Sequence, residues 1–165
     1  MHEDHLKGLV GDVENTASKP NLTWDYGTIY CCTMTYRLML LRFPNLKSYL
    51  VPLELDKEYV IDTMNTLDVP PGTKDLQIKI RMVDANHCPG SAMIILTGPL
   101  GTLLHTGDFR YNGTKMLQSI GLTKIDYMYL DNTFCVPDED FPIQAVAYDK
   151  MVKIIKEKLE ENKDY

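Results

Sequence analysis

Long apolar runs and paired cysteines are both missing from this sequence. No apolar run approaches the roughly 18 residues that a membrane-spanning helix needs, so we expect a soluble domain made in the cytosol, with no membrane association. Only four cysteines are present and none forms a Cys-x-x-Cys pair, which argues against a zinc ribbon. We expect reduced and mostly buried thiols at all four positions, Cys31, Cys32, Cys88 and Cys135.

Positive charge is also scarce. The 165 residues include 17 Lys and Arg against 23 Asp and Glu, which gives a formal net charge of −6. This balance argues against a protein that binds nucleic acid through a broad basic surface. It leaves open a nuclease whose bound metal supplies the positive charge, although this segment alone should hold DNA poorly.

Hydrophobic patterning predicts many short strands and two helices. Residues 76–83 alternate between apolar and polar side chains, as in a half-buried strand, and Cys31 and Cys32 should face opposite sides of another. Helices are expected over 33–43, with Thr33 as N-cap, and over 143–159. The remaining strands are expected at 28–32, 49–51, 58–61, 92–96, 102–106 and 125–130. This order favours an α+β or mixed-sheet layer fold.

A cluster of potential metal ligands stands near the start of the sequence, in the pattern His-x-Asp-His. On a tight loop, His2, Asp4 and His5 could converge on one or two divalent ions, because imidazole and carboxylate suit zinc and its neighbours. A solvated cluster without a ligand is an equally good interpretation of these three residues alone.

Further polar residues fall at or just past strand ends. His87 follows the alternating strand, and Asp108 and Asp131 follow later strands. Taken singly, His87 is more often structural, and Asp108 could cap its own turn. If the strands share a sheet edge, these residues and Asp84 would gather there, which favours one metal site. His105 is interpreted as structural, because it should face away from the neighbours of Asp108.

Three motifs together carry a family resemblance. The runs DANHCPGSAMIIL, LLHTGDFR and YLDNTF, with HEDHLKGL near the start, resemble the Artemis and Apollo group of DNA cross-link repair proteins within the β-CASP metallo-β-lactamases. The resemblance implies an incomplete metallo-β-lactamase-like αββα sandwich over residues 1–135 and the start of a β-CASP region over 136–165.

The same resemblance implies a metal centre and its chemistry, metal-dependent hydrolysis of phosphodiesters. Asp131 would support the site, and Asp4 would hold or deprotonate water, so Asp4, Asp108 and Asp131 are the implied catalytic residues. Zinc is expected as one or two ions, with magnesium or manganese as alternatives. The implied ligands are His2 and His87 for one ion, Asp4 and His5 for a second, and Asp108 between them.

The implied function is a nuclear DNA nuclease, a 5′ exonuclease or structure-specific enzyme of cross-link or double-strand-break repair, acting on DNA with possible repair partners. An RNA-processing β-CASP nuclease and a small-ester or thioester hydrolase remain alternatives, although the NHCPGS, GDFR and LDNTF contexts favour the DNA branch. The family's first motif His would fall before Met1 and its later motifs beyond Tyr165. We therefore expect a fragment of a longer nuclease, or a metal-deficient remnant with a binding role.

Overall fold

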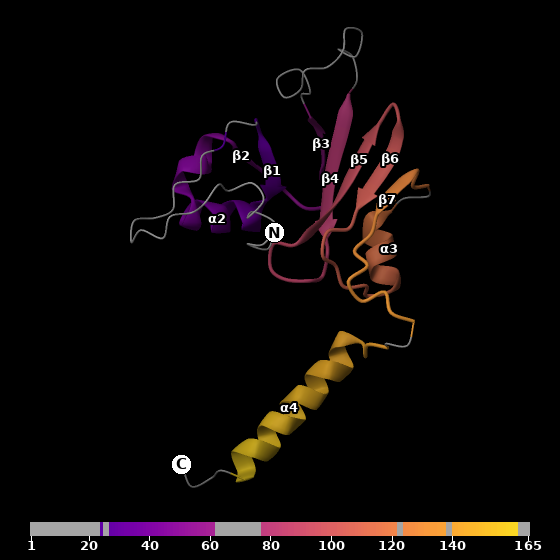
Figure 1. Ribbon diagram of the computed structural model, residues 1–165. Helices are drawn as coiled ribbons and strands as arrows, with labels where there is room; N and C mark the ends of the chain where they lie inside the picture. Colours follow the sequence, from indigo (N-terminus) through magenta and orange to yellow (C-terminus); the bar gives the residue numbers. More distant parts are fainter. Residues whose placement is uncertain (1–23, 25–26, 62–76, 122–123, 138–139, 162–165) are drawn as a thin grey trace. The chain divides into compact units, whose positions relative to one another are not determined.

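The computed structural model describes residues 24, 27–61, 77–121, 124–137 and 140–161, in two compact units, Met1–Asp131 and Asn132–Tyr165 (Figure 1). Sheets and three α-helices in the described residues confirm a mixed α and β composition. The first unit contains, in order, β1 (Ile29–Cys32), α2 (Thr33–Arg42), the 3-10 helix η1 (Pro44–Ser48), β2 (Leu50–Leu53), β3 (Glu58–Ile61), β4 (Ile78–Asp84), β5 (Ala92–Gly98), β6 (Gly101–His105), α3 (Thr114–Ile120) and β7 (Tyr127–Tyr129). The second unit contains α4 (Gln144–Glu161).

The larger sheet has five strands in the order β3-β4-β5-β6-β7. All of its pairs are antiparallel except the last, in which β7 runs parallel to β6. Two successive antiparallel pairings give β4 and β6 the same direction, and β7 shares it. The C-terminal ends of β4, β6 and β7 therefore lie at one edge of the sheet, as the sequence analysis required for a common site.

A smaller parallel pair, β1 and β2, lies between α2 and the larger sheet. Cys31 packs in the cluster that includes Met39 and Phe43 at α2, whereas Cys32 packs with Ile80 and Met82 of β4. The two cysteines therefore face opposite sides of β1, as strand geometry predicts. They join the outer helix, the small sheet and the large sheet through two apolar interfaces.

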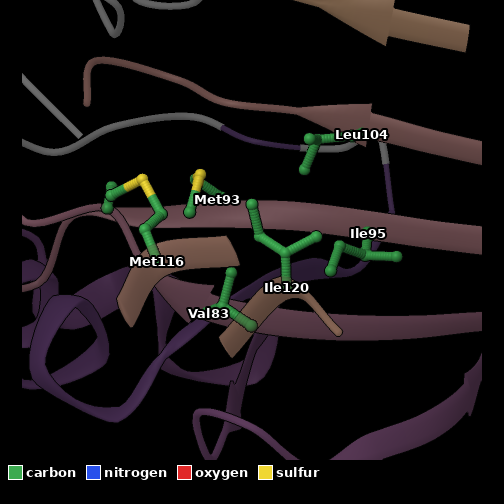
Figure 2. Packing of buried hydrophobic residues seen from close by; sticks show 7 residues of the cluster. Val83, Met93, Ile95, Leu104, Met116 and Ile120 are labelled. Carbon is green, nitrogen blue, oxygen red and sulfur yellow. The ribbon is translucent and has the colours of Figure 1, made fainter. Parts of the chain in front are cut away.

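The opposite face of the larger sheet is covered by α3. Met116 and Ile120 of this helix pack on Val83, Met93 and other buried side chains of the sheet (Figure 2). The layers follow the order α2, small sheet, large sheet, α3. Helix α3 was not predicted, because its seven residues are too few for a clear helical period. Its one local signal in the sequence is Gly121, which is left-handed with φ 60° at the C-cap.

Two details of the predicted elements change in the structure. Cys32, not Thr33, caps α2, because its sulfur accepts a hydrogen bond from the backbone N–H of Thr35 at 3.4 Å. Residue 76, where the alternating strand was expected to begin, lies outside the described residues, and β4 runs from Ile78. On the α3 face of β4, Arg81 donates to the backbone carbonyls of Ser119 and Ile120.

Helix α4 confirms the helix expected over 143–159, but none of its residues is buried within its own unit. Val146, Ile154 and Leu159 are all about half exposed or more. Ion pairs such as Lys153 with Glu157 at 3.8 Å lie along the helix and contribute only a few tenths of a kcal/mol each. None of the helices in the described ranges is long and apolar enough to cross a membrane.

The packing of α3 can be tested on neighbouring residues of one helix. Met116 is 4% exposed and Leu117 is 56% exposed. We expect Met116→Ala to lower the free energy of unfolding by about 2–5 kcal/mol, because it leaves a cavity against the sheet. The matched change Leu117→Ala should stay within about 0.5 kcal/mol. Urea unfolding measures both, and equal losses would contradict the position of α3.

Candidate functional site

His87 stands in the loop from β4 to β5, and the hydroxyl of Ser91 holds that loop together. The Ser91 Oγ accepts the backbone N–H of His87 at 3.3 Å and that of Cys88 at 3.1 Å, and it donates to the carbonyl of Cys88 at 2.8 Å. Ser91 is buried, with 9% exposure. Because the Ser91 hydroxyl forms hydrogen bonds with three backbone groups at once, it fixes the main chain that carries His87.

Gly90 ties the same loop to the start of α2. Its φ is +90°, as expected for the glycine of this turn, and its carbonyl accepts the Thr35 hydroxyl at 2.8 Å and the Cys32 thiol at 3.2 Å. A Cβ at this position would lie 2.9 Å from the Thr35 Oγ1. The close approach of the two backbones therefore requires glycine.

A second set of bonds joins this loop to the one that follows β6. The Asn86 side-chain amide donates to the carbonyl of Arg110 at 3.0 Å, and the Arg110 N–H donates to the carbonyl of Ala85 at 2.9 Å. Asp84, one of the four predicted strand-end residues, accepts the backbone N–H of Asn86 at 2.8 Å. It therefore supports this turn, in which Asn86 has φ 54°.

Asp108 follows Gly107, which has φ 54°. The buried Thr106 donates its hydroxyl to the carbonyl of Gly107 at 2.9 Å and accepts the backbone N–H of Asp131 at 3.0 Å. The Gly107 N–H donates to Nδ1 of His105 at 3.0 Å. The turn that carries Asp108 is thus fixed by the ends of both β6 and β7.

The structure brings His87 and Asp108 together. The His87 Nε2 and the Asp108 Oδ2 lie 3.9 Å apart, with the side chains 37% and 34% exposed. Two donors bound to one tetrahedral zinc at roughly 2.0–2.2 Å lie about 3.4 Å apart, so a shift of about half an ångström would let this pair share one ion. Both side chains also keep access to solvent.

The structure describes only some of the other residues of the predicted site. No group of three His, Cys, Asp or Glu able to hold a metal occurs among the described residues. His2, Asp4 and His5 lie outside the described ranges. Asp131 is half-buried at the same edge, and its backbone contacts the Asp108 turn through Thr106. The ligand and catalytic roles of these residues stay predictions.

A cavity of about 220 Å³ is lined by His87, Asp108, His105 and Gly107. The interpretation that His105 faces away from the neighbours of Asp108 is therefore wrong. The strict alternation stops where β6 ends, and Gly107, with φ 54°, donates its N–H to the His105 ring. A second cavity of about 510 Å³ shares His87 and Cys88 with the first.

The cysteines are all free thiols but only partly buried. Cys31 and Cys32 are buried as expected, whereas Cys88 and Cys135 are exposed. Cys88 is exposed because it lies in the loop that lines the cavities rather than in a strand. Periodicity within strands gave no information about such a loop position.

The first unit consists of α and β layers, and its His87 and Asp108 meet just past the ends of β4 and β6, two strands that run in the same direction. Comparison with models of protein families finds no match. Individual relatives do match: the chain is 34% identical to the 5′ exonuclease Apollo of Danio rerio over 163 residues, 95% of this chain and 25% of that protein. It is 35% identical over 161 residues to the DNA cross-link repair protein SNM1 of Arabidopsis thaliana, with 95% and 28% covered.

It is also 35% identical over 144 residues to the protein artemis of Danio rerio, 82% of this chain and 21% of that protein. The chain belongs to the family of DNA cross-link repair proteins that includes Apollo, SNM1 and Artemis. It spans about a quarter of the length of these curated relatives.

The glycine of the His87 loop gives a direct test of the site's scaffold. Gly90→Ala should be more destabilising than Gly113→Ala, because both residues have positive φ but only Gly90 would place its Cβ against Thr35; nothing lies within 4 Å at Gly113. Positive φ costs on the order of 1–3 kcal/mol in each variant. Thermal unfolding of the two proteins measures the difference, and equal losses would show that the loop has room for a side chain.

The thiols provide a test that depends on pH. Burial, and next the neighbouring Cys32, raises the pKa of Cys31 to about 11 from an ordinary 9.0. Folding therefore favours the neutral thiol, and this contribution to stability is lost as the pH rises from about 9 to 11. At pH 8 we expect iodoacetamide to modify Cys88 and Cys135 in the folded chain and Cys31 only after unfolding. Peptide mapping measures the order, and early modification of Cys31 would contradict its burial.

Proposed function

We propose that the chain is part of a metal-dependent DNA nuclease that acts in interstrand cross-link or double-strand-break repair in the nucleus. One observation carries the proposal: in a member of this repair family, His87 and Asp108 meet at 3.9 Å just past the ends of β4 and β6, two strands that run in the same direction. The layer order α2, small sheet, large sheet, α3 supports a metallo-β-lactamase-like sandwich. Residues from 136 onward would begin a β-CASP region.

The proposed centre holds zinc, or magnesium or manganese, through imidazole and carboxylate groups. A bound divalent ion would polarise the phosphoryl oxygen and provide a nucleophile from water near neutral pH. His87 would bind through Nε2 and Asp108 through Oδ2, the atoms that face each other. Asp4 would take a proton from water, and Asp131 would hold the ligands in place. The full proposed ligand set is His2, Asp4, His5, His87 and Asp108.

The negative net charge of the chain supports the proposal that the substrate binds mainly at this metal centre. The net charge of −6 repels phosphate over the surface as a whole. A carboxylate such as Asp108 would add to that repulsion unless a cation neutralises it. The metal ions and the exposed edge around His87 would therefore supply most of the attraction for a DNA strand. The affinity for DNA should fall steeply with salt only where lysine or arginine contacts the phosphates.

Metal binding is the first test. Competition titration should show that Asp108→Asn and His87→Gln each weaken zinc binding by at least about tenfold, because each removes a ligand. Asp126→Asn is a matched control: Asp126 accepts the Thr102 N–H at the opposite edge of the sheet, so its change should leave zinc affinity within about twofold. Zinc binding that ignores both site variants would refute the proposed centre.

Cleavage is the second test. With zinc, magnesium or manganese, we expect this chain to degrade 5′-phosphorylated single-stranded DNA, but only weakly, because it holds phosphate poorly. We expect Asp108→Ala to abolish the cleavage. Cleavage of RNA or of a thioester in place of DNA would replace the DNA assignment with one of those activities. Metal binding without any hydrolysis would favour a binding role.

A further inference from the structure

We propose that His105 is a positioning residue for Asp108: its Nδ1 fixes the Gly107 peptide so that the Asp108 carboxylate faces His87. This inference rests on the proposed function, because it gives His105 a task at the same metal centre. It concerns a residue that binds no metal itself and whose effect passes through one backbone hydrogen bond.

Both polar groups of Gly107 are held. Its N–H donates to Nδ1 of His105 at 3.0 Å, and its carbonyl accepts the Thr106 hydroxyl at 2.9 Å. Gly107 has φ +54°, yet a Cβ built there would meet only the Ala92 carbonyl, at an ordinary 3.6 Å. Glycine is thus needed for its backbone conformation rather than for space, and the two hydrogen bonds select that conformation from the many that glycine can adopt.

The His105 ring is itself held in place. It stacks on Tyr129, with ring centroids 5.6 Å apart and an interplanar angle of 19°. The two residues are direct partners in the pairing of β6 with β7, and just beyond them the Thr106 N–H donates to the Tyr129 carbonyl at 2.9 Å. The stacking therefore restricts the plane of the His105 ring, and in this orientation of the ring Nδ1 faces the Gly107 N–H.

The position of Asp108 relative to His87 depends on this turn. Ser91 holds the backbone of the His87 loop, whereas His105 holds the backbone next to Asp108. Rotation about the Gly107 backbone would carry Asp108 away from the 3.9 Å contact. Ligand donors that lose their orientation bind metal more weakly, commonly by about 10–100-fold.

Because Nδ1 accepts a hydrogen bond, the neutral ring must carry its proton on Nε2. This requirement separates positioning from simple packing. His105→Asn retains an acceptor oxygen at a distance from the backbone similar to that of Nδ1. His105→Phe retains a ring able to stack on Tyr129 but has no acceptor.

The experiment compares these two variants with the wild-type chain. Nitrogen NMR of wild type should show His105 with its proton on Nε2. Amide hydrogen exchange of Gly107 should speed up by about tenfold in His105→Phe, the loss of one hydrogen bond, and by less than about threefold in His105→Asn. Zinc affinity should fall about 10–100-fold in His105→Phe and stay within about threefold in His105→Asn.

Equal behaviour of the two variants in exchange and in zinc affinity would overturn the inference, as would a proton on Nδ1 in wild type. If residue 105 acted only on stability, both variants would have lower urea midpoints, and His105→Asn would not differ from His105→Phe in Gly107 exchange or zinc affinity. If the wild-type chain binds none of zinc, magnesium and manganese, the proposed function fails. In that case, faster Gly107 exchange in His105→Phe than in His105→Asn would still support the positioning of Asp108 by His105. Equal exchange in the two variants would reject that role.

Discussion

The directions in which β4, β6 and β7 run control the chemistry available to this molecule. Antiparallel pairing of β5 with each of its neighbours, followed by parallel pairing of β7 with β6, brings the chain out of three strands at one edge. Side chains near those exits share a small region although up to 47 positions separate Asp84 from Asp131. The hydrogen-bonded pairing of the strands thus fixes the location of the site without any contact between its side chains. Apolar layers on both faces of the sheet hold the strands together.

Backbone hydrogen bonds then turn a shared location into a defined geometry. The loop that carries His87 bonds to Ser91, to the start of α2 and to the loop that carries Asp108. Each such bond contributes only about 0.5–1.5 kcal/mol net, but together they remove alternative conformations of both loops. A metal centre needs donors held within a fraction of an ångström, and this network supplies that restraint without burying His87 or Asp108.

Family membership and physical geometry support the same interpretation from independent directions. The relatives of this chain are named for exonuclease activity and cross-link repair, and the edge of the sheet presents an imidazole and a carboxylate close enough for one divalent ion. The acidic balance of the sequence argues against a broad basic binding surface.

The sequence by itself determined the family, through its motifs, and most strands, through hydrophobic patterning such as the alternation over 76–83. It also indicated that His87 and Asp108 would gather at one end of the sheet, because both residues follow strands. Only the tertiary structure decided the burial of α3, the sulfur cap at Cys32 and the acceptor role of His105. Alternation and helical periodicity describe one segment at a time, whereas these features arise when a backbone group from one segment meets a side chain or a sheet face whose position depends on the whole fold.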